Sequence, residues 1–363
     1  MPKNCYVHIP FCSSKCNYCS FVSFPCLEKM TGYVFSLLKE ISENYNCEPL
    51  ETLYIGGGTP SLLSVDLLSK LIKKFNFAQG AEITIEVNPE DVSREKIESY
   101  LKIGINRISM GVQSLDDNIL KICGRRHSAQ KALEAIDVIS TTGCRNLSVD
   151  LIYGLPEQTL EGFLNDTKRL MGCPITHISL YGLKIEDNSA FALKTPKNLP
   201  DDDAQADMYI EVCDLLQKNG FLQYEISNFA KDGYSSKHNL NYWNNNEYYG
   251  FGVAAHGYVD GFRYYNTSSI DDYMAKPHVA EYAHHVTVQE ALEEEIFLGM
   301  RRSSGINILD VNSKYGIDFE KKYESVLKKF DEEFIKRENN RISFTSKGFM
   351  LSNVILSEFI GEL

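Results

Sequence analysis

The 363-residue sequence predicts an α/β fold in which an incomplete parallel barrel of six strand–helix units precedes an α-rich C-terminal part. Two observations lead to this prediction. Short runs rich in Ile, Val, Leu and Tyr alternate with amphipathic stretches up to about residue 185, and such alternation is typical of parallel sheets with crossover helices. Glycine or polar residues also follow most of these runs, as they do at the functional rim of a parallel barrel.

Six strands are predicted, each followed by glycine, proline or polar residues. They cover residues 5–10, 52–57, 82–87, 107–112, 147–153 and 177–183. Apolar residues at helical spacing predict crossover helices at 67–75 and 132–139, and Ser93 is expected to cap a third. Six units are too few for a closed eight-stranded barrel, so we expect a partial (β/α)6 barrel of the TIM type.

Beyond about residue 186 the pattern changes. Three aspartates at 201–203 are expected to begin a helix, and residues 223–265 are rich in aromatic side chains and asparagine. The last part combines helices with a hairpin around residues 342–344 and resembles a winged helix in outline. We predict a barrel at 1–185, an extension of it at 186–287 and a helical, winged-helix-like module at 288–363. The part after residue 186 is expected to close over the barrel rim.

Composition limits the function classes. The formal net charge of −12 argues against nucleic-acid binding, because phosphate contacts need a basic face. No segment approaches the roughly 18 to 20 apolar residues of a membrane helix, and the N-terminus does not have the pattern of a signal peptide. We therefore expect a cytoplasmic protein whose ten cysteines form no disulfide framework. Peripheral membrane contact and a homodimer both stay open.

Three of the cysteines have spacing that indicates chemistry. Cys12, Cys16 and Cys19 form a C-x3-C-x2-C loop directly after the first strand. Three thiolates can hold three irons of a [4Fe-4S] cluster and leave the fourth iron open to a small ligand. A structural zinc site would need a fourth ligand, for which Cys26 is the nearby candidate. We favour the cluster, because further motifs follow the neighbouring strands.

The ends of the later strands supply those motifs. The segment G-G-G-T-P at 56–60 follows the second strand, and its glycines should expose backbone N–H groups to a ligand. Carboxylates can accept hydrogen bonds from ribose or ammonium groups, and a guanidinium can pair with a carboxylate. The candidate ligand contacts are Gly57, Gly58, Thr59, Glu86, Gln113, Arg125 and Asp150.

With these motifs the sequence resembles the radical S-adenosylmethionine superfamily, and within it the oxygen-independent coproporphyrinogen III oxidase group. The resemblance implies that the open iron binds S-adenosylmethionine and that reduction of the cluster releases a 5′-deoxyadenosyl radical. It also implies that G-G-G-T-P supports the methionine end of this cofactor. Two aromatic cofactor contacts follow from the same resemblance: Tyr6, just before V-H-I-P-F-C, and Tyr18, before the last cluster cysteine.

Two departures separate the sequence from the oxidases of this group. They usually carry a further cysteine two residues beyond the third, where this chain has Phe21, and an N-terminal extension before the cluster loop. The motif H-N-L-N-Y-W at 238–243, preceded by Y-E-I-S-N-F-A at 224–230, is instead similar to the signature of HemW-type haem chaperones. That similarity implies haem as a third cofactor and a haem-acceptor protein as partner, with His238 as candidate iron ligand.

Several alternatives remain at this stage. The favoured function is a haem chaperone with little or no turnover of S-adenosylmethionine, so enzyme activity is left open. The second is an oxidase that decarboxylates coproporphyrinogen III to protoporphyrinogen IX, and a haem-degrading radical methyltransferase is the third. His238 also has a structural alternative, as a hydrogen-bonded packing residue, and His256 competes with it as ligand.

Overall fold

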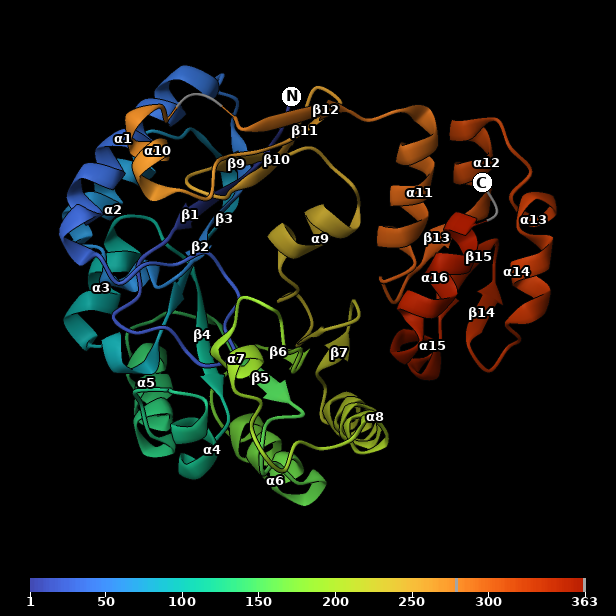
Figure 1. Ribbon diagram of the computed structural model, residues 1–363, viewed down its shortest axis with the longest axis horizontal. Coiled ribbons are helices and arrows are strands. Elements are labelled where there is room, and N and C mark those ends of the chain that lie inside the picture. Colours follow the sequence, from blue (N-terminus) through green and yellow to red (C-terminus); the bar gives the residue numbers. More distant parts are fainter. Residues whose placement is uncertain (278–279, 362–363) are drawn as a thin grey trace.

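One curved sheet organises the molecule, for which the computed structural model describes residues 1–277 and 280–361 (Figure 1). The nine strands follow the order β7-β8-β6-β5-β4-β3-β2-β1-β9. The six central strands are parallel, which confirms the predicted α/β fold with six barrel strands. These are β1 (Asn4–Ile9), β2 (Leu50–Gly57), β3 (Phe77–Val87), β4 (Arg107–Gln113), β5 (Asn146–Tyr153) and β6 (His177–Gly182).

Helices cover the outer face of this sheet (Figure 1). They are α1 (Met30–Asn44), α2 (Val65–Ile72), α3 (Arg94–Lys102), α4 (Asp117–Ile122), α5 (Ala129–Thr141) and α6 (Leu160–Met171), with short 3-10 turns η1 (Leu27–Lys29), η2 (Pro60–Leu62) and η3 (Pro89–Asp91). The predicted cap is confirmed, because the Ser93 side chain accepts a hydrogen bond from the backbone N–H of Lys96.

The two faces of the barrel strands differ in polarity, because successive side chains of a strand point to opposite sides. Residues that face the helices are apolar and fully buried, among them Val7, Ile55, Ile85, Met110 and Val149. Residues that alternate with them face the barrel interior and are polar although buried, among them Thr52, Glu82, Arg107, Ser148 and His177. Buried polar groups need partners, and the extension after residue 186 supplies several of them.

The extension enlarges the sheet at both edges. It contains α7 (Ala190–Leu193), α8 (Asp202–Lys218), β7 (Leu222–Gln223), β8 (Asn228–Ala230), α9 (Lys237–Trp243), β9 (Tyr249–Phe251), β10 (His256–Val259), β11 (Phe262–Tyr265), α10 (Ile270–Ala275) and β12 (Tyr282–His285). Strand β9 pairs parallel to β1, and β8 pairs antiparallel to β6. The aspartate run begins α8 as predicted, with Asp201 as its N-cap. Strands β10, β11 and β12 form a separate antiparallel sheet.

Helix α9 seals the interior of the barrel at the N-terminal end of its strands. The buried carboxylate of Glu82 on β3 accepts hydrogen bonds from the N–H groups of Lys237 (3.2 Å) and His238 (3.1 Å) and from the Ser236 hydroxyl (3.3 Å). A carboxylate at this position satisfies N–H groups that a helix N-terminus leaves without intrahelical partners. The H-N-L-N-Y-W motif is thereby drawn into the barrel.

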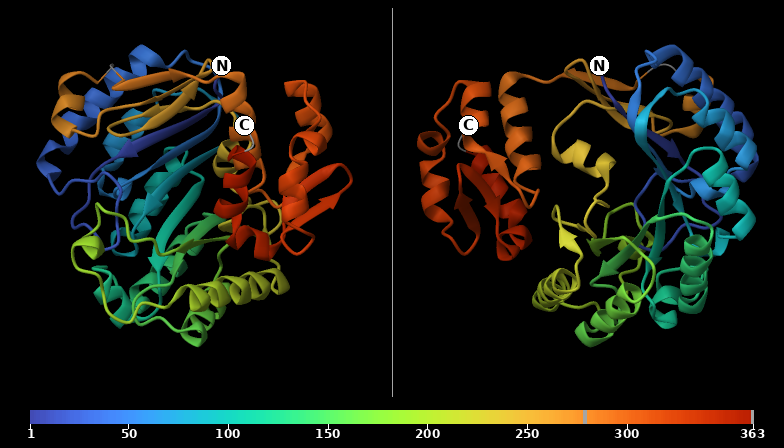
Figure 2. Two further views of the ribbon diagram at one scale, coloured as in Figure 1. Left: turned by 45° about the vertical axis from the view of Figure 1, so that its right-hand side comes forward. Right: turned by 180° about the vertical axis from the view of Figure 1, so that it is seen from behind.

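The C-terminal module lies beside the open side of the barrel, next to α8 and α9 (Figures 1 and 2). It comprises α11 (Val288–Gly299), β13 (Ile306–Asn307), α12 (Ile308–Tyr315), α13 (Phe319–Lys322), α14 (Glu324–Lys329), β14 (Ile335–Glu338), β15 (Arg341–Phe344), α15 (Ser346–Met350) and α16 (Ser352–Gly361). The hairpin expected around residues 342–344 is present as β14 and β15. Within the described residues, no helix has both the length and the apolar character that a membrane crossing requires.

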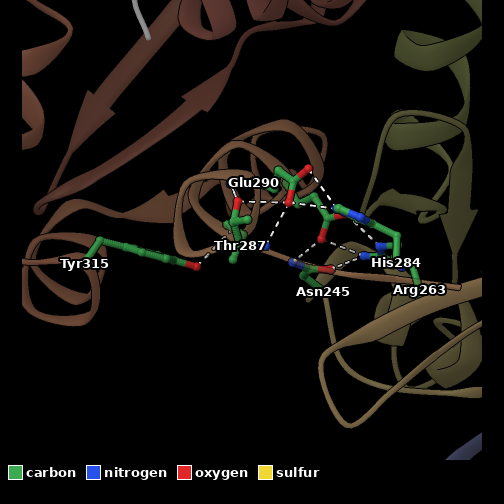
Figure 3. Close-up of polar contacts among 8 residues, drawn as sticks. Asn245, Arg263, His284, Thr287, Glu290 and Tyr315 are labelled. Carbon is green, nitrogen blue, oxygen red and sulfur yellow. Dashed lines mark hydrogen bonds and ion pairs between the residues drawn. The ribbon is translucent and has the colours of Figure 1, made fainter.

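Polar contacts attach α11 to the extension (Figure 3). Thr287 and Glu290 form a reciprocal capping box at the start of α11, and His284 of β12 lies 2.9 Å from the Glu290 carboxylate. Arg263 of β11 donates to both carboxylate oxygens of Glu294, at 2.6 and 2.8 Å. Such two-point pairing fixes orientation as well as distance, so α11 is held against the small sheet.

Candidate functional site

A cavity of about 450 Å³ opens at the C-terminal ends of the barrel strands. It gathers predicted residues from distant parts of the chain: Cys12, Cys16, Tyr18, Cys19, Gly57, Gly58, Thr59, Glu86, Gln113, Arg125 and Asp150. Lining residues absent from our prediction include Tyr54, Glu90, Ser109, Tyr181 and Lys184. Every lining residue among those described falls between residues 12 and 186. The later part of the chain reaches the rim at α7, where the N–H of Phe191 donates to the Asn17 carbonyl of the cysteine loop (2.9 Å), but the described residues beyond 186 do not line the cavity itself as expected.

The cysteine loop is anchored on both sides of its thiols. At its start, the Cys12 N–H donates to the Phe24 carbonyl (3.1 Å), and the Phe24 N–H donates back to the Pro10 carbonyl (2.6 Å). In its middle, the N–H of Asn17 donates to the carbonyl of Cys123 (2.9 Å). These bonds hold an otherwise irregular segment over the end of β1.

The three thiols are partly exposed and have donors beside them. The Thr59 hydroxyl lies 3.5 Å from the Cys12 sulfur, and Nη1 of Arg125 lies 3.5 Å from the Cys16 sulfur. Among the described residues, no three His, Cys, Asp or Glu side chains converge as ligands of a single metal ion. Three thiols in the wall of one cavity fit a cluster, because each cysteine then binds a different iron and the fourth iron stays open to a ligand.

Glycine is required at two positions of the G-G-G-T-P segment. Gly57 has a φ of +115°, and a Cβ there would lie 2.6 Å from the His8 ring, while a Cβ on Gly58 would lie 2.7 Å from the Phe11 carbonyl oxygen. Their N–H groups are already bonded, to Glu86 Oε2 (3.0 Å) and to the Ile9 carbonyl (2.8 Å). Our expectation of unpaired N–H groups fails here, because the glycines serve close packing of β1 against β2.

Two carboxyl groups line the same cavity. Glu86 accepts hydrogen bonds from the Tyr54 hydroxyl (2.8 Å) and from the N–H of Gly57, and burial raises its pKa to about 7. Asp150 lies 3.5 Å from the Ser109 hydroxyl, and burial raises its pKa as well. Both groups can therefore accept hydrogen bonds from a cationic or hydroxyl-bearing ligand when ionised.

Gln113 and Arg125 form a further part of the cavity wall. Gln113 has a φ of +69°, unusual for a residue with a side chain, and its buried Oε1 has no hydrogen-bond partner among the described residues. Arg125 donates to Asn88 Oδ1 (2.8 Å) and to the Gly111 carbonyl (2.6 Å). Backbone strain and unsatisfied buried acceptors concentrate at ligand sites, so this wall has the features of a binding surface.

Two predicted site residues lie outside the rim cavity. The Tyr6 hydroxyl is bonded to His8 Nδ1 (2.9 Å), and the His8 ring packs beneath Gly57. His238 is 1% exposed and lies inside the barrel between β2 and its own helix. The competing His256 is exposed on β10, with its ring 5.3 Å from that of Tyr265.

Both ring nitrogens of His238 are engaged. Nδ1 lies 2.7 Å from the Thr52 hydroxyl, and Nε2 lies 2.8 Å from the Tyr242 hydroxyl. Because Thr52 donates its single hydroxyl proton to Asn4 Oδ1 (2.9 Å), Nδ1 must be the protonated nitrogen and Nε2 carries the lone pair. Burial lowers the pKa of His238 to about 3, so the ring is neutral. Tyr242 alone caps the nitrogen that a metal would take.

Comparison with known proteins agrees with this architecture. Residues 6–170 match the Radical SAM superfamily model, and residues 286–351 match the HemN C-terminal domain. Coproporphyrinogen III oxidase HemN from Escherichia coli, described as a radical SAM enzyme, has the same fold. The TM-score is 0.87 over 100% of this chain and 91% of that one, at 22% sequence identity. The barrel and its cysteine loop thus define a radical S-adenosylmethionine protein, a class that implies a [4Fe-4S] cluster and S-adenosylmethionine.

Relatives of higher identity narrow the class. Heme chaperone HemW of Lactococcus lactis is 37% identical over 99% of this chain and 97% of the relative. The Bacillus subtilis protein of the same name is 35% identical over 99% of this chain and 100% of the relative. The Escherichia coli protein is 40% identical over 71% of this chain and 70% of the relative. The chain belongs to the HemW family.

Proposed function

We propose that this chain is a haem chaperone, which binds haem and passes it to an acceptor protein. The observation that carries the proposal is its alignment with proteins named heme chaperone over nearly the whole length of both chains. A neutral histidine whose Nε2 lone pair accepts one hydrogen bond, from the Tyr242 hydroxyl, supports it, because such an imidazole can ligate haem iron once that bond opens. The ten cysteines, all free, fit the proposed cytoplasmic location.

At the rim we propose that Cys12, Cys16 and Cys19 hold a [4Fe-4S] cluster. A bound cluster would supply the electron for reductive cleavage of S-adenosylmethionine. The surrounding residues orient that molecule: Glu86 and Asp150 accept hydrogen bonds from its ribose or ammonium groups, and Arg125 pairs with its carboxylate. The remaining proposed contacts are Tyr18, Gly57, Gly58, Thr59 and Gln113, with Tyr6 supporting Gly57 from below through His8.

Binding of S-adenosylmethionine should depend on pH through Glu86. Because the pKa of this carboxyl is raised to about 7, it is protonated below that pH and ionised above it. The ionised form is the better acceptor, so affinity should increase between about pH 6 and pH 8. Calorimetric titration of the cluster-loaded protein measures this, and Glu86→Gln should flatten the profile. A wild-type profile as flat as that of the variant would contradict the assignment.

For the haem site we propose His238 Nε2 as axial ligand, which requires the Tyr242 hydroxyl to move aside. Both residues lie on α9, one helical turn apart, and Tyr242 is partly exposed whereas His238 is not. Thr52 would keep its hydrogen bond to Nδ1 throughout. Such a bond fixes the tautomer and raises the basicity of a ligating imidazole.

Haem titration of three variants tests this assignment through the Soret band. His238→Ala should weaken haem binding at least about tenfold, whereas Tyr242→Phe should bind haem faster, because the phenol that occupies Nε2 is gone. His256→Ala is the matched control and should bind like the wild type, because that exposed ring lies outside the barrel interior, on the separate sheet of β10, β11 and β12. Wild-type affinity in His238→Ala, with native circular dichroism, would refute the assignment.

Transfer and turnover separate the chaperone from the alternative oxidase. The haem-loaded chain should give up its haem to an apo-haem protein added in excess. Anaerobic incubation of the cluster-loaded chain with a reductant, S-adenosylmethionine and coproporphyrinogen III should leave the tetrapyrrole mass unchanged. Loss of two carboxyl groups in step with formation of 5′-deoxyadenosine would identify an oxidase instead.

A further inference from the structure

Tyr54 stands between the two proposed sites. This residue of β2 lines the rim cavity, where its hydroxyl donates to Glu86 Oε1 at 2.8 Å. Its ring stacks on the ring of His238, with centroids 5.1 Å apart and planes inclined by 26°. One side chain therefore contacts a carboxylate assigned to S-adenosylmethionine and the imidazole assigned to haem.

The contacts around Tyr54 leave it little freedom. The Tyr6 ring stacks near it, with centroids 6.2 Å apart and planes inclined by 27°. Thr52 lies two residues earlier on the same strand, and its hydroxyl is hydrogen-bonded to Nδ1 at the edge of the His238 ring. The ring of Tyr54 stacks on the face of the same imidazole. Closely packed rings adopt discrete arrangements rather than continuous ones, so a shift of Tyr54 requires His238 to shift as well.

We propose that Tyr54 is a positioning residue that couples S-adenosylmethionine binding at the rim to haem ligation by His238. The inference rests on the proposed function. A ligand that donates hydrogen bonds to Glu86 competes with the Tyr54 hydroxyl for the same oxygen. Once the Tyr54 hydroxyl leaves Glu86, the Tyr54 ring can shift and no longer fixes the position of His238. The Nε2 atom of His238 can then separate from the Tyr242 hydroxyl. Coupling between two binding equilibria is reciprocal, so haem must affect S-adenosylmethionine binding by the same factor.

The test is haem titration of the cluster-loaded protein without reductant, in the presence and absence of S-adenosylmethionine. Tyr54→Phe keeps the ring and removes only the bond to Glu86. Tyr209→Phe is the matched control, because Tyr209 is also a buried tyrosine with a hydrogen-bonded hydroxyl, here to the Ile226 carbonyl (2.7 Å), but it lies on α8. Calorimetric titration of S-adenosylmethionine with and without haem supplies the reciprocal measurement.

We expect S-adenosylmethionine to tighten haem binding at least about fivefold in the wild type and in Tyr209→Phe, and less than about twofold in Tyr54→Phe. Equal coupling in all three proteins would overturn the role of Tyr54. Haem binding that S-adenosylmethionine leaves unchanged in the wild type would overturn the coupling while sparing the chaperone function. A Soret band that keeps the position and width of free haem after addition of the protein would instead overturn the proposed function.

Discussion

Replacing Cys16 with serine is expected to abolish the cluster. The loop holds three thiols at the rim cavity, and a serine hydroxyl at neutral pH does not replace a thiolate as an iron ligand. The loss should be complete rather than partial, because the two remaining cysteines would leave two irons without protein ligands. Iron and sulfide analysis after anaerobic reconstitution, together with visible absorption, measures the effect.

Cys26 provides the matched control for this experiment. It follows the same loop and is also a free, partly exposed thiol, yet it does not line the cavity. Cys26→Ser should therefore reconstitute like the wild type. If Cys26→Ser lost its iron and Cys16→Ser kept it, the cluster assignment would fail. Iron loss in both variants would show that Cys26 is a fourth cluster ligand, which would leave no iron open to S-adenosylmethionine.

The residues at the rim could be predicted from the sequence, because the strands and the residues that follow them are recognisable from short stretches of the chain. Short runs rich in Ile, Val, Leu and Tyr, each followed by glycine, proline or polar residues, identified the strands, and the parallel arrangement places their C-terminal ends at one edge. Cys12, Glu86 and Gln113 therefore meet without any knowledge of side-chain contacts. Tyr54 was missed for the same reason, since a tyrosine inside a strand has no local signal that distinguishes a cavity wall from the core.

The interior of the barrel could not be predicted in this way. Glu82 and His238 are 156 positions apart, and their contact depends on how a later helix enters the barrel. The motif around His238 was visible in the sequence, but its burial and its bonds to Thr52 and Tyr242 were not. The position of the C-terminal module was missed similarly, because it depends on packing between whole elements rather than on periodicity.

Glu82→Gln is expected to destabilise the protein by about 3 kcal/mol and to release α9 from the barrel. Glu82 is 5% exposed and is the acceptor for the first N–H groups of α9. Its charge also opposes that of Arg107, which is 1% exposed and has two guanidinium nitrogens without hydrogen-bond partners among the described residues. An amide would remove the strongest opposing charge from this buried cation, and its NH2 group cannot accept the bonds that the second carboxylate oxygen accepts.

Two spectroscopic signals distinguish local release of α9 from a general loss of stability. Trp243, the single tryptophan of the chain, lies on α9, so its fluorescence reports the helix while far-ultraviolet circular dichroism reports the whole fold. In urea, the two signals should coincide for the wild type, and the fluorescence transition of Glu82→Gln should come first. Glu51→Gln, at the exposed start of β2 and paired with Lys3 at the surface, should change stability by less than about 0.5 kcal/mol. Coincident transitions in Glu82→Gln would mean that α9 is held by its packing rather than by this carboxylate. The haem site proposed at His238 would then have to open by another route.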